Sequence, residues 1–424
     1  MSKIGKLLKH PILFFKDIGK RPSVSYFKNE ISVANISLYT YEVALYFSGT
    51  IGNIYQIQQW IEILKVLNEQ KEVIFIVRNK RVYNWLSEKS SFVVVYCKTV
   101  DDLNKIYTQN NFKCILYVNN GYKNFQSLML GNALHVHINH GESDKTSTIS
   151  NQSKAYDYVL IVSEAAYIKY NLNLIKKDMR NYIQVGRPQL EHIEEIAPFV
   201  IENDTSIMRK KVILYAPTWE GTHESMNFTS LNDYGMSLVK NIIDNPEFYL
   251  IYKPHPHTGS RDTESERINK KIIEILNTHK NGEVVLEGDI NSLYKHINLA
   301  IFDNSAVAVD YLQVDKPMIM TDMFYRLQGD QEKPQISKAA VMLAVHDVQN
   351  IATIISKELK KDSLKEIRNT IKYYFLGHFD YSKNESTKKF ISTILDIINE
   401  RDELVLALDK MNEIHSSINN IQKG

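Results

Sequence analysis

Short apolar runs alternate with stretches of helical periodicity from about residue 40 onward. In the first half of the chain we expect strands over residues 43–47, 73–77, 92–96, 114–118, 134–139 and 158–162. Between them, residues 54–67 and 121–130 follow the period of an amphipathic helix. Continuous apolar runs rich in β-branched residues, separated by helices, are typical of parallel strands that are buried on both faces.

A polar stretch at residues 202–211 separates this half from a second series of the same kind. Here we expect strands over residues 212–215, 248–252, 283–286, 299–302 and 318–320, with helices over 234–243, 264–276 and 307–312. Two successive series predict an α/β protein of two Rossmann-like, doubly wound domains that face each other across a cleft. The expected divisions are residues 1–36, 37–200, 201–348 and 349–424, of which the middle two are the Rossmann-like domains.

The first 36 residues form a basic amphipathic segment. Before residue 22, six cations surround apolar side chains and Asp17 is the only acid, while Pro11 interrupts the helical pattern. Such a segment is suited to lie in the interface over anionic lipid. A helix packed on the domain surface with solvated lysines is the alternative interpretation.

Residues 384–424 predict a long helix with a narrow apolar seam. Its members are separated by 4, 3, 3, 4 and 3 residues: Leu404, Leu408, Met411, Ile414, Ile418 and Ile421. This spacing is typical of a short coiled coil and suggests a homo-oligomer formed through the C-terminal helix. The alternative is that the helix packs on its own domain.

Composition narrows the class of protein. The chain has 424 residues, a hydrophobic fraction of 44% and a formal net charge of only +2, which disfavours a nucleic-acid partner. Cys97 and Cys114 lie in apolar runs, which indicates buried thiols in a reducing compartment. Neither a membrane-spanning run nor a signal-peptide pattern is apparent, so we expect a cytoplasmic protein, peripheral on the inner face of the plasma membrane if the N-terminal segment binds lipid.

Two candidate chemical segments follow expected strands. His140 precedes Gly141 at the end of one strand, where a histidine with a pKa near neutral is suited to take a proton from an attacking hydroxyl. Glu142 or Asp144 would hold its other ring nitrogen. The second segment carries Thr218 and Trp219 after a strand that ends in a proline-fixed turn.

Two further segments follow strands of the second half. The first comprises Lys253, His255 and His257, which alternate with two prolines, and this set suits charge-assisted hydrogen bonds to a diphosphate better than zinc. The other segment is Asp303–Ser305, where Asn304 or Ser305 would cap a helix whose first N–H groups bind an anion. One turn later, Asp310 would reach a ribose hydroxyl. A purely structural role is the alternative for each of these segments.

These segments, in this order and spacing, resemble the CDP-glycerol glycerophosphotransferases of teichoic-acid and capsule synthesis. That family carries a His-Gly-Thr-Pro-Leu-Lys segment, a Gly-x-Pro-Arg segment, Tyr-Ala-Pro-Thr-Trp, His-Pro-His, and an Asp-Tyr-Ser-Ser stretch followed by Lys-Pro. The matching residues are His140, Gly141 and Lys145; Gly186 and Pro188; Tyr215–Trp219; His255–His257; Asp303, Ser305, Asp310 and Tyr311; Lys316 and Pro317. The resemblance covers roughly residues 115–325.

What the resemblance implies is a GT-B-type fold, with the acceptor in the N-terminal domain and the nucleotide in the C-terminal domain. His140 would be the base on the acceptor hydroxyl. Lys253, His255, His257, Asn304 and Ser305 would hold the donor diphosphate. Thr218, Asp303 and Asp310 would lie near the ribose or nucleotide, and Glu142, Asp144, Lys145 and Arg187 on the acceptor side.

This chain departs from the family pattern at three places. Glu142, Ser143 and Asp144 replace Thr-Pro-Leu, Gln189 stands where the family has arginine, and Asn304 replaces tyrosine. The acid pair near His140 suggests a different acceptor or transferred group.

The predicted reaction is therefore transfer of a polyol phosphate from a CDP-alcohol to a hydroxyl of a polymer or lipid-linked acceptor, with release of CMP and without a required metal or other cofactor. A glycosyltransferase that uses a nucleotide sugar on the same fold is the alternative enzyme, since fold likeness does not separate the two. A non-catalytic scaffold of a capsule assembly complex is the non-enzymatic alternative.

Overall fold

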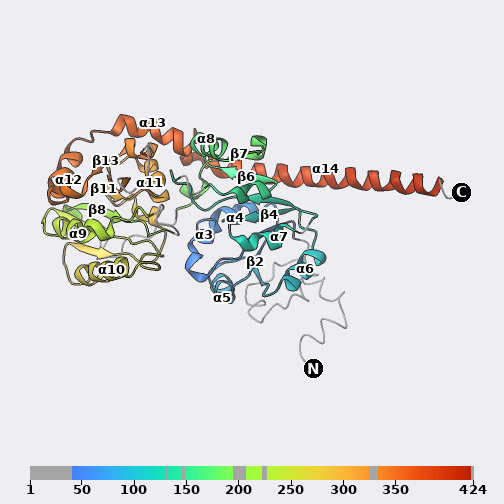
Figure 1. Cartoon of the computed structure of the whole chain (residues 1–424), viewed down its shortest axis with the longest axis horizontal. Coiled ribbons are helices and arrows are strands. Elements are labelled where there is room, and N and C mark those ends of the chain that lie inside the picture. The colour runs from blue at the N-terminus through green and yellow to red at the C-terminus, as the bar shows by residue number, and fades with distance from the viewer. Residues whose placement is uncertain are drawn as a thin grey trace, which may run out of the picture.

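The computed structural model describes residues 41–129, 131–145, 149–193, 207–221, 227–324 and 333–421, with side chains to residue 415. The basic amphipathic segment at residues 1–36 lies outside these ranges. The described strands form two parallel sheets in two lobes that lie side by side (Figure 1). This confirms the predicted α/β architecture.

The first sheet has seven strands in the order β3-β2-β1-β4-β5-β6-β7. Their bounds are β1 Val43–Phe47, β2 Val73–Val77, β3 Val93–Tyr96, β4 Cys114–Tyr117, β5 Leu134–His137, β6 Tyr158–Ile161 and β7 Tyr182–Gln184. The helices between them are α3 Tyr55–Gln58, α4 Ile61–Asn68, α5 Lys80–Lys89, α6 Val100–Gln109, α7 Phe125–Leu128 and α8 Glu164–Asn173. Because β1 pairs with β2 on one side and β4 on the other, the strand order reverses at β1/β4.

The second sheet has six strands in the order β10-β9-β8-β11-β12-β13. Their bounds are β8 Lys211–Ala216, β9 Phe248–Tyr252, β10 Gly282–Val284, β11 Leu299–Phe302, β12 Met318–Thr321 and β13 Val341–Leu343. The helices are α9 Met236–Ile243, α10 Thr263–Leu276, α11 Ala306–Tyr311, α12 Ile351–Lys360 and α13 Lys365–Leu376. Here the order reverses at β8/β11, so both sheets present a crevice at the carboxyl ends of their strands.

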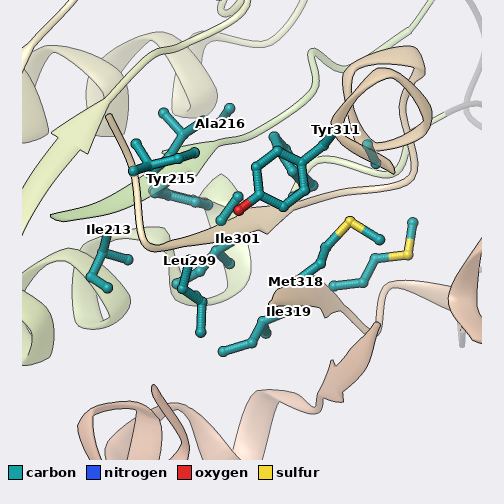
Figure 2. Close-up of a cluster of buried hydrophobic side chains, with 14 of the residues drawn as sticks. Ile213, Tyr215, Ala216, Leu299, Ile301, Tyr311, Met318 and Ile319 are labelled. Carbon is teal, nitrogen blue, oxygen red and sulfur yellow. The ribbon is translucent and has the colours of Figure 1, made fainter. Parts of the chain in front are cut away.

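Buried aliphatic and aromatic side chains hold the second sheet to its helices. Figure 2 shows Tyr311 of α11 over Ile301 of β11, with Met318 and Ile319 of β12 beside them. The Tyr311 ring also lies edge-on to Phe302, with 5.2 Å between ring centroids. This packing fixes α11 on the sheet and thereby fixes the residues just before it.

The final helix, α14 Glu385–Ile421, returns to the first lobe. Its first part joins the core of the first sheet through Phe390, Ile394 and Ile397, and Phe390 lies 5.0 Å from Trp60 between ring centroids. Its later part extends well beyond the lobe (Figure 1). There Leu404, Leu408, Met411 and Ile414 of the predicted seam are 49–64% exposed.

Candidate active site

The predicted base lies at the carboxyl end of the first sheet. Asn139, two residues after β5, adopts a left-handed backbone with φ of 55°, and its Oδ1 accepts from the backbone N–H of His140 at 2.8 Å. A left-handed residue turns the chain sharply, and asparagine tolerates it better than most residues do. The turn therefore projects His140 from the strand end. Gly141 is needed for a different reason, because a Cβ there would lie 3.3 Å from the Ala306 Cβ of the other lobe.

The imidazole of His140 is held by the first lobe, in a way the sequence did not reveal. Its Nδ1 lies 2.7 Å from the carbonyl oxygen of Val118, which can only accept, so Nδ1 carries the proton. Its Nε2 is left as an acceptor and lies 3.4 Å from the amide nitrogen of Gln56. The expectation that Glu142 or Asp144 orients this ring was wrong, since both carboxylates have other partners.

Burial and the nearby Arg187 charge lower the pKa of His140 to about 4, although the bond to Val118 acts in the opposite direction. The expectation of a pKa near neutral was therefore wrong. A lower pKa leaves the ring neutral across the physiological range, with its basic nitrogen available.

His255 and His257 lie at the facing end of the second sheet, just after β9. The indole of Trp219 stacks on His255, with 5.8 Å between centroids and planes 15° apart, and lies 5.2 Å from the His257 ring. His255 Nδ1 accepts from the backbone N–H of His257 at 3.0 Å. Burial, helped by the positive groups around it, lowers the pKa of His255 to about 3, and burial also lowers the pKa of His257 despite the carboxylate of Glu220.

The two lobes bring these histidines together around one side chain. The ring of Tyr55, from α3 of the first lobe, lies edge-on to His140, His255 and His257 with centroid distances of 5.9, 5.9 and 6.4 Å. A direct hydrogen-bond contact also joins the lobes, with 3.1 Å between Asn53 Nδ2 and His257 Nε2. The predicted base and the predicted diphosphate ligands thus converge on one cleft.

The loop after His140 reaches across the cleft. Glu142 forms a buried ion pair with Lys169 of its own lobe, whereas Asp144 Oδ2 accepts from the Ile336 N–H of the second lobe at 3.0 Å. Burial lowers the pKa of Lys145 to about 8, against the opposing field of Asp303. Because Lys145 interacts electrostatically with Asp303 and His255, it faces the predicted donor side and not only the acceptor side as expected.

Asp303, predicted near the nucleotide, is fully buried and holds loops together. Its Oδ2 accepts from the backbone N–H groups of Thr218 at 2.8 Å and Ser230 at 3.2 Å, and its Oδ1 accepts from Thr321 Oγ1 at 2.5 Å. Thr218 itself is 4% exposed. Asp303 therefore shapes the cleft in this structure from beneath it, in place of the predicted contact with a nucleotide.

Ser305 is the N-cap residue of α11, but its side chain makes no capping bond, contrary to expectation. Its Oγ instead donates to the Asp303 carbonyl oxygen at 3.3 Å. Asn304 is 2% exposed, and neither its amide nitrogen nor its amide oxygen has a hydrogen-bond partner. Since an unpaired buried amide is costly, this side chain is suited to a ligand in the cleft.

Arg187 and Asp310 form a buried ion pair between the lobes. Arg187 Nε donates to Asp310 Oδ1 at 3.0 Å and Nη2 donates to Oδ2 at 3.1 Å, while both side chains are 5% exposed. Nη2 also donates to Gln59 Oε1 and to the carbonyl oxygen of His140. Asp310 is thus a lobe-to-lobe partner rather than a side chain open to a ribose, and Arg187 braces the base rather than facing outward to an acceptor.

Lys253 directly follows β9, two residues before His255. Its Nζ donates to the Glu287 carbonyl oxygen at 3.1 Å, and burial lowers its pKa to about 8 in spite of nearby Asp289 and Glu287. Within the described ranges, no group of three or more His, Cys, Asp or Glu side chains is placed to hold a metal ion.

Sequence reasoning missed Asn53, Tyr55 and Gln56. They follow β1 at the point where the strand order of the first sheet reverses, which is where ligands are expected. Their apolar neighbours made residues 54–67 resemble one packed helix. The structure divides this stretch into α3 and α4, and Trp60 between them donates its indole N–H to the Asn139 carbonyl at 2.7 Å.

The comparisons with known proteins show the family and the fold of the chain. The family model of the CDP-Glycerol:Poly(glycerophosphate) glycerophosphotransferases matches residues 53–328, more than half of the chain. The chain belongs to this family. The match to the glycerophosphotransferase family spans Asn53, Tyr55, His140 and both histidines after β9. No curated protein matches the chain.

Solved structures show the same fold. The wall teichoic acid polymerase TagF is 15% identical with a TM-score of 0.57, and the alignment covers 95% of this chain and 98% of that one. A glycosyltransferase from Rickettsia africae is 15% identical (TM-score 0.51, 86% and 99% covered), and S. aureus MnaA with UDP is 13% identical (TM-score 0.54, 84% and 98% covered). The glycerophosphotransferase chain therefore has the predicted GT-B-type fold.

Proposed function

We propose that this glycerophosphotransferase moves glycerol phosphate, or a similar polyol phosphate, from a CDP-alcohol to a hydroxyl of a growing cell-surface polymer or lipid-linked glycan. The acceptor oxygen attacks the β-phosphorus in line, and His140 Nε2 takes the hydroxyl proton. The bond from the β-phosphorus to the oxygen bridging the two phosphates breaks, and CMP leaves with that oxygen. The product is a new phosphodiester.

The observation that carries this proposal is the meeting of His140 with His255 and His257 around the Tyr55 ring. A base must lie on one side of the reacting phosphorus and the groups that hold the leaving phosphate on the other. Phosphoryl transfer depends mainly on positioning and electrostatic stabilisation, so a site without a nucleophile is sufficient.

In this proposal, lysine side chains and not a metal ion supply the positive charge that the diphosphate needs. The ammonium groups of Lys145 and Lys253 have pKa values of about 8 and therefore remain mostly protonated at pH 7. A bound diphosphate would favour their charged forms further. We accordingly expect turnover to survive removal of divalent cations with a chelator.

A thermal-shift screen with CDP-glycerol, CDP-ribitol, CMP and several nucleotide sugars tests the donor, because binding to the native state alone raises the melting temperature. Product analysis then separates the two enzymatic functions. A phosphodiester with CMP release supports the proposal, whereas a glycosidic bond would establish the glycosyltransferase alternative. Failure of every cytidine nucleotide to bind would favour the scaffold.

We further propose that the basic segment at residues 1–36 places the enzyme on an anionic membrane surface on the cytoplasmic side, close to a lipid-linked acceptor. In the part of the chain that the structure describes, none of the helices has the length and apolar character required to cross a bilayer. Co-sedimentation with vesicles that contain anionic lipid tests this role. Replacing Lys3, Lys6 and Lys9 with glutamate should abolish it, and equal binding by the variant would refute it.

Self-association through α14 is the corresponding proposal for the exposed seam. Leu408 and Met411 are 58% and 64% exposed on a helix that extends past the first lobe. Burying such side chains in a second helix is favourable by about 1.5–3 kcal/mol each. Sedimentation velocity should show a concentration-dependent dimer that L408K/M411K converts to a monomer, and a monomeric wild type would reject the proposal.

A further inference from the structure

A short segment of the first lobe touches all three histidines of the cleft. It comprises residues 51–58, which form the 3-10 turn Ile51–Asn53 and helix α3. Asn53 contacts His257, Tyr55 lies against all three imidazole rings, and Gln56 contacts His140.

The contact between Asn53 and His257 has a defined direction. Asn53 Oδ1 already accepts from the backbone N–H of Thr50 at 3.2 Å and from its hydroxyl at 3.0 Å. The amide nitrogen therefore points to His257 and donates to its Nε2. In the neutral ring, the proton must then be on Nδ1, and Nδ1–H is the group that His257 can offer to a ligand.

The other two rings are fixed in different states. His255 Nδ1 accepts from a backbone N–H, so its proton is on Nε2. His140 Nδ1 donates to the Val118 carbonyl oxygen, so its Nε2 is an acceptor. Gln56 faces this nitrogen with its amide N–H group because its Oε1 accepts from Asn119 Nδ2 at 2.8 Å. One ring thus presents an acceptor and two present donors, which suits one base and two phosphate ligands.

His255 and His140 owe these states to groups of their own lobes, but His257 depends on the opposite lobe. The approach is close, since a Cβ on Gly52 would lie 3.3 Å from His257 Cε1. Glycine at this position lets the turn reach the ring. The state of His257 therefore depends on the two lobes being together.

We propose that Asn53 is a positioning residue. When the two lobes close, it fixes His257 in the tautomer that binds a diphosphate. When the cleft opens, Asn53 no longer donates to His257 Nε2, and this nitrogen can then carry the ring proton. Donor capture and assembly of the base are then coupled through one segment, residues 51–58. This inference rests on the proposed function only in assigning the ligand of His257 as the donor diphosphate.

Asn53→Asp is the sharpest test, because the aspartate keeps an oxygen for the Thr50 cap and replaces the amide donor with a negatively charged acceptor. Protein labelled with ¹⁵N-histidine reports which ring nitrogen carries the proton, with the His257 signals assigned by their loss in His257→Gln. We expect Nδ1 protonation in the wild type with CMP and Nε2 protonation in Asn53→Asp. Gly52→Val, which pushes the turn away, should also release Nε2.

The kinetic counterpart is measured as CMP release from CDP-glycerol. Asn53→Asp should raise KM for the donor about tenfold, with a smaller change in kcat. Gln58→Ala, an exposed change on the same helix, is the matched control and should behave as wild type. A wild-type His257 that carries its proton on Nε2, or an Asn53→Asp variant with unchanged ring signals and unchanged KM, would overturn the proposal.

The ring signals need no turnover, so the two ideas fail separately. If Asn53→Asp moves the ring proton of His257 but CDP-alcohols give no CMP, the donor assignment is wrong and the coupling stands. If CDP-glycerol is turned over normally and the ring signals of His257 are the same in the wild type and in Asn53→Asp, the reaction stands and the coupling is wrong.

Discussion

Replacing Asp310 with asparagine should destabilise the closed protein without removing a nucleotide contact. The carboxylate receives two hydrogen bonds from Arg187, and both side chains are 5% exposed. Asparagine keeps the shape but removes the carboxylate that pairs directly with the buried guanidinium, so that only the more distant charge of Asp289 remains to offset it. Breaking a buried pair by neutralising one partner costs about 3–5 kcal/mol. We expect a value near the lower limit, about 3 kcal/mol, because the Gln59 and His140 oxygens still accept from Arg187.

A double-mutant cycle isolates the pair. Arg187→Met combined with Asp310→Asn removes the unpaired charge, so the double variant should be more stable than the sum of the single changes implies, by about 2 kcal/mol. Glu264→Gln is the control, since Glu264 and Arg267 form an exposed pair on α10 whose loss should leave the denaturation midpoint almost unchanged.

The assay combines chemical denaturation, followed by tryptophan fluorescence, with calorimetric titration of CMP at a temperature where every variant is folded. The ion-pair argument predicts a lower denaturation midpoint and little change in CMP affinity for Asp310→Asn. The opposite pattern, an unchanged midpoint with CMP affinity reduced tenfold or more, would refute it and restore the ribose contact expected from the sequence.

Three other outcomes are expected. His140→Ala should lower kcat by a factor of about 10²–10⁴ with CMP affinity unchanged. Because the pKa of His140 is about 4, the acid limb of the wild-type kcat/KM profile should lie near pH 4, and a limb near pH 6.5 would contradict the assigned base. Lys145→Met should raise donor KM about tenfold, measured by CMP release, and an unchanged KM would place this lysine away from the diphosphate. His137 stacks on Tyr156, and burial lowers its pKa from 6.5 to about 3. Between pH 6.5 and about 3 the unfolded chain therefore binds a proton at His137 that the folded chain does not, so stability falls as the pH drops through this window. His137→Phe should reduce the slope of unfolding free energy against pH there by about 1.4 kcal/mol per unit. An equal slope in the variant would show that His137 does not titrate in this window.

The central strands could be predicted closely because each is a continuous apolar run. β1, β2, β9 and β11 have the predicted bounds. β7 and β13 were missed because each is a three-residue edge strand that forms no fully buried apolar run, whereas β10, an edge strand of the same length, was found because apolar residues continue beyond it to Leu286. Edge strands need only one neighbour, so their sequences carry little of the signal that marks a central strand.

The site was predictable where chemistry follows a strand and not where it depends on a partner. His140, His255 and His257 were found because they follow strands, and the structure brings them to one cleft. Asp310 was assigned to the wrong surroundings and the donor-side neighbours of Lys145 were not anticipated, because these neighbours come from the opposite lobe, more than a hundred residues away in sequence. Single-sequence patterns describe one element at a time and contain no information on such pairs.

The return of α14 to the first lobe has a consequence for biosynthesis. A nascent chain emerges from the ribosome with its N-terminus first, yet the core around Trp60 includes Phe390, Ile394 and Ile397. Until translation is nearly complete, the first sheet therefore exposes an apolar groove where this helix belongs. Incomplete domains of this kind are prone to aggregate. We expect chains truncated before residue 385 to be captured by chaperones or degraded, even though they contain all the described strands of both sheets.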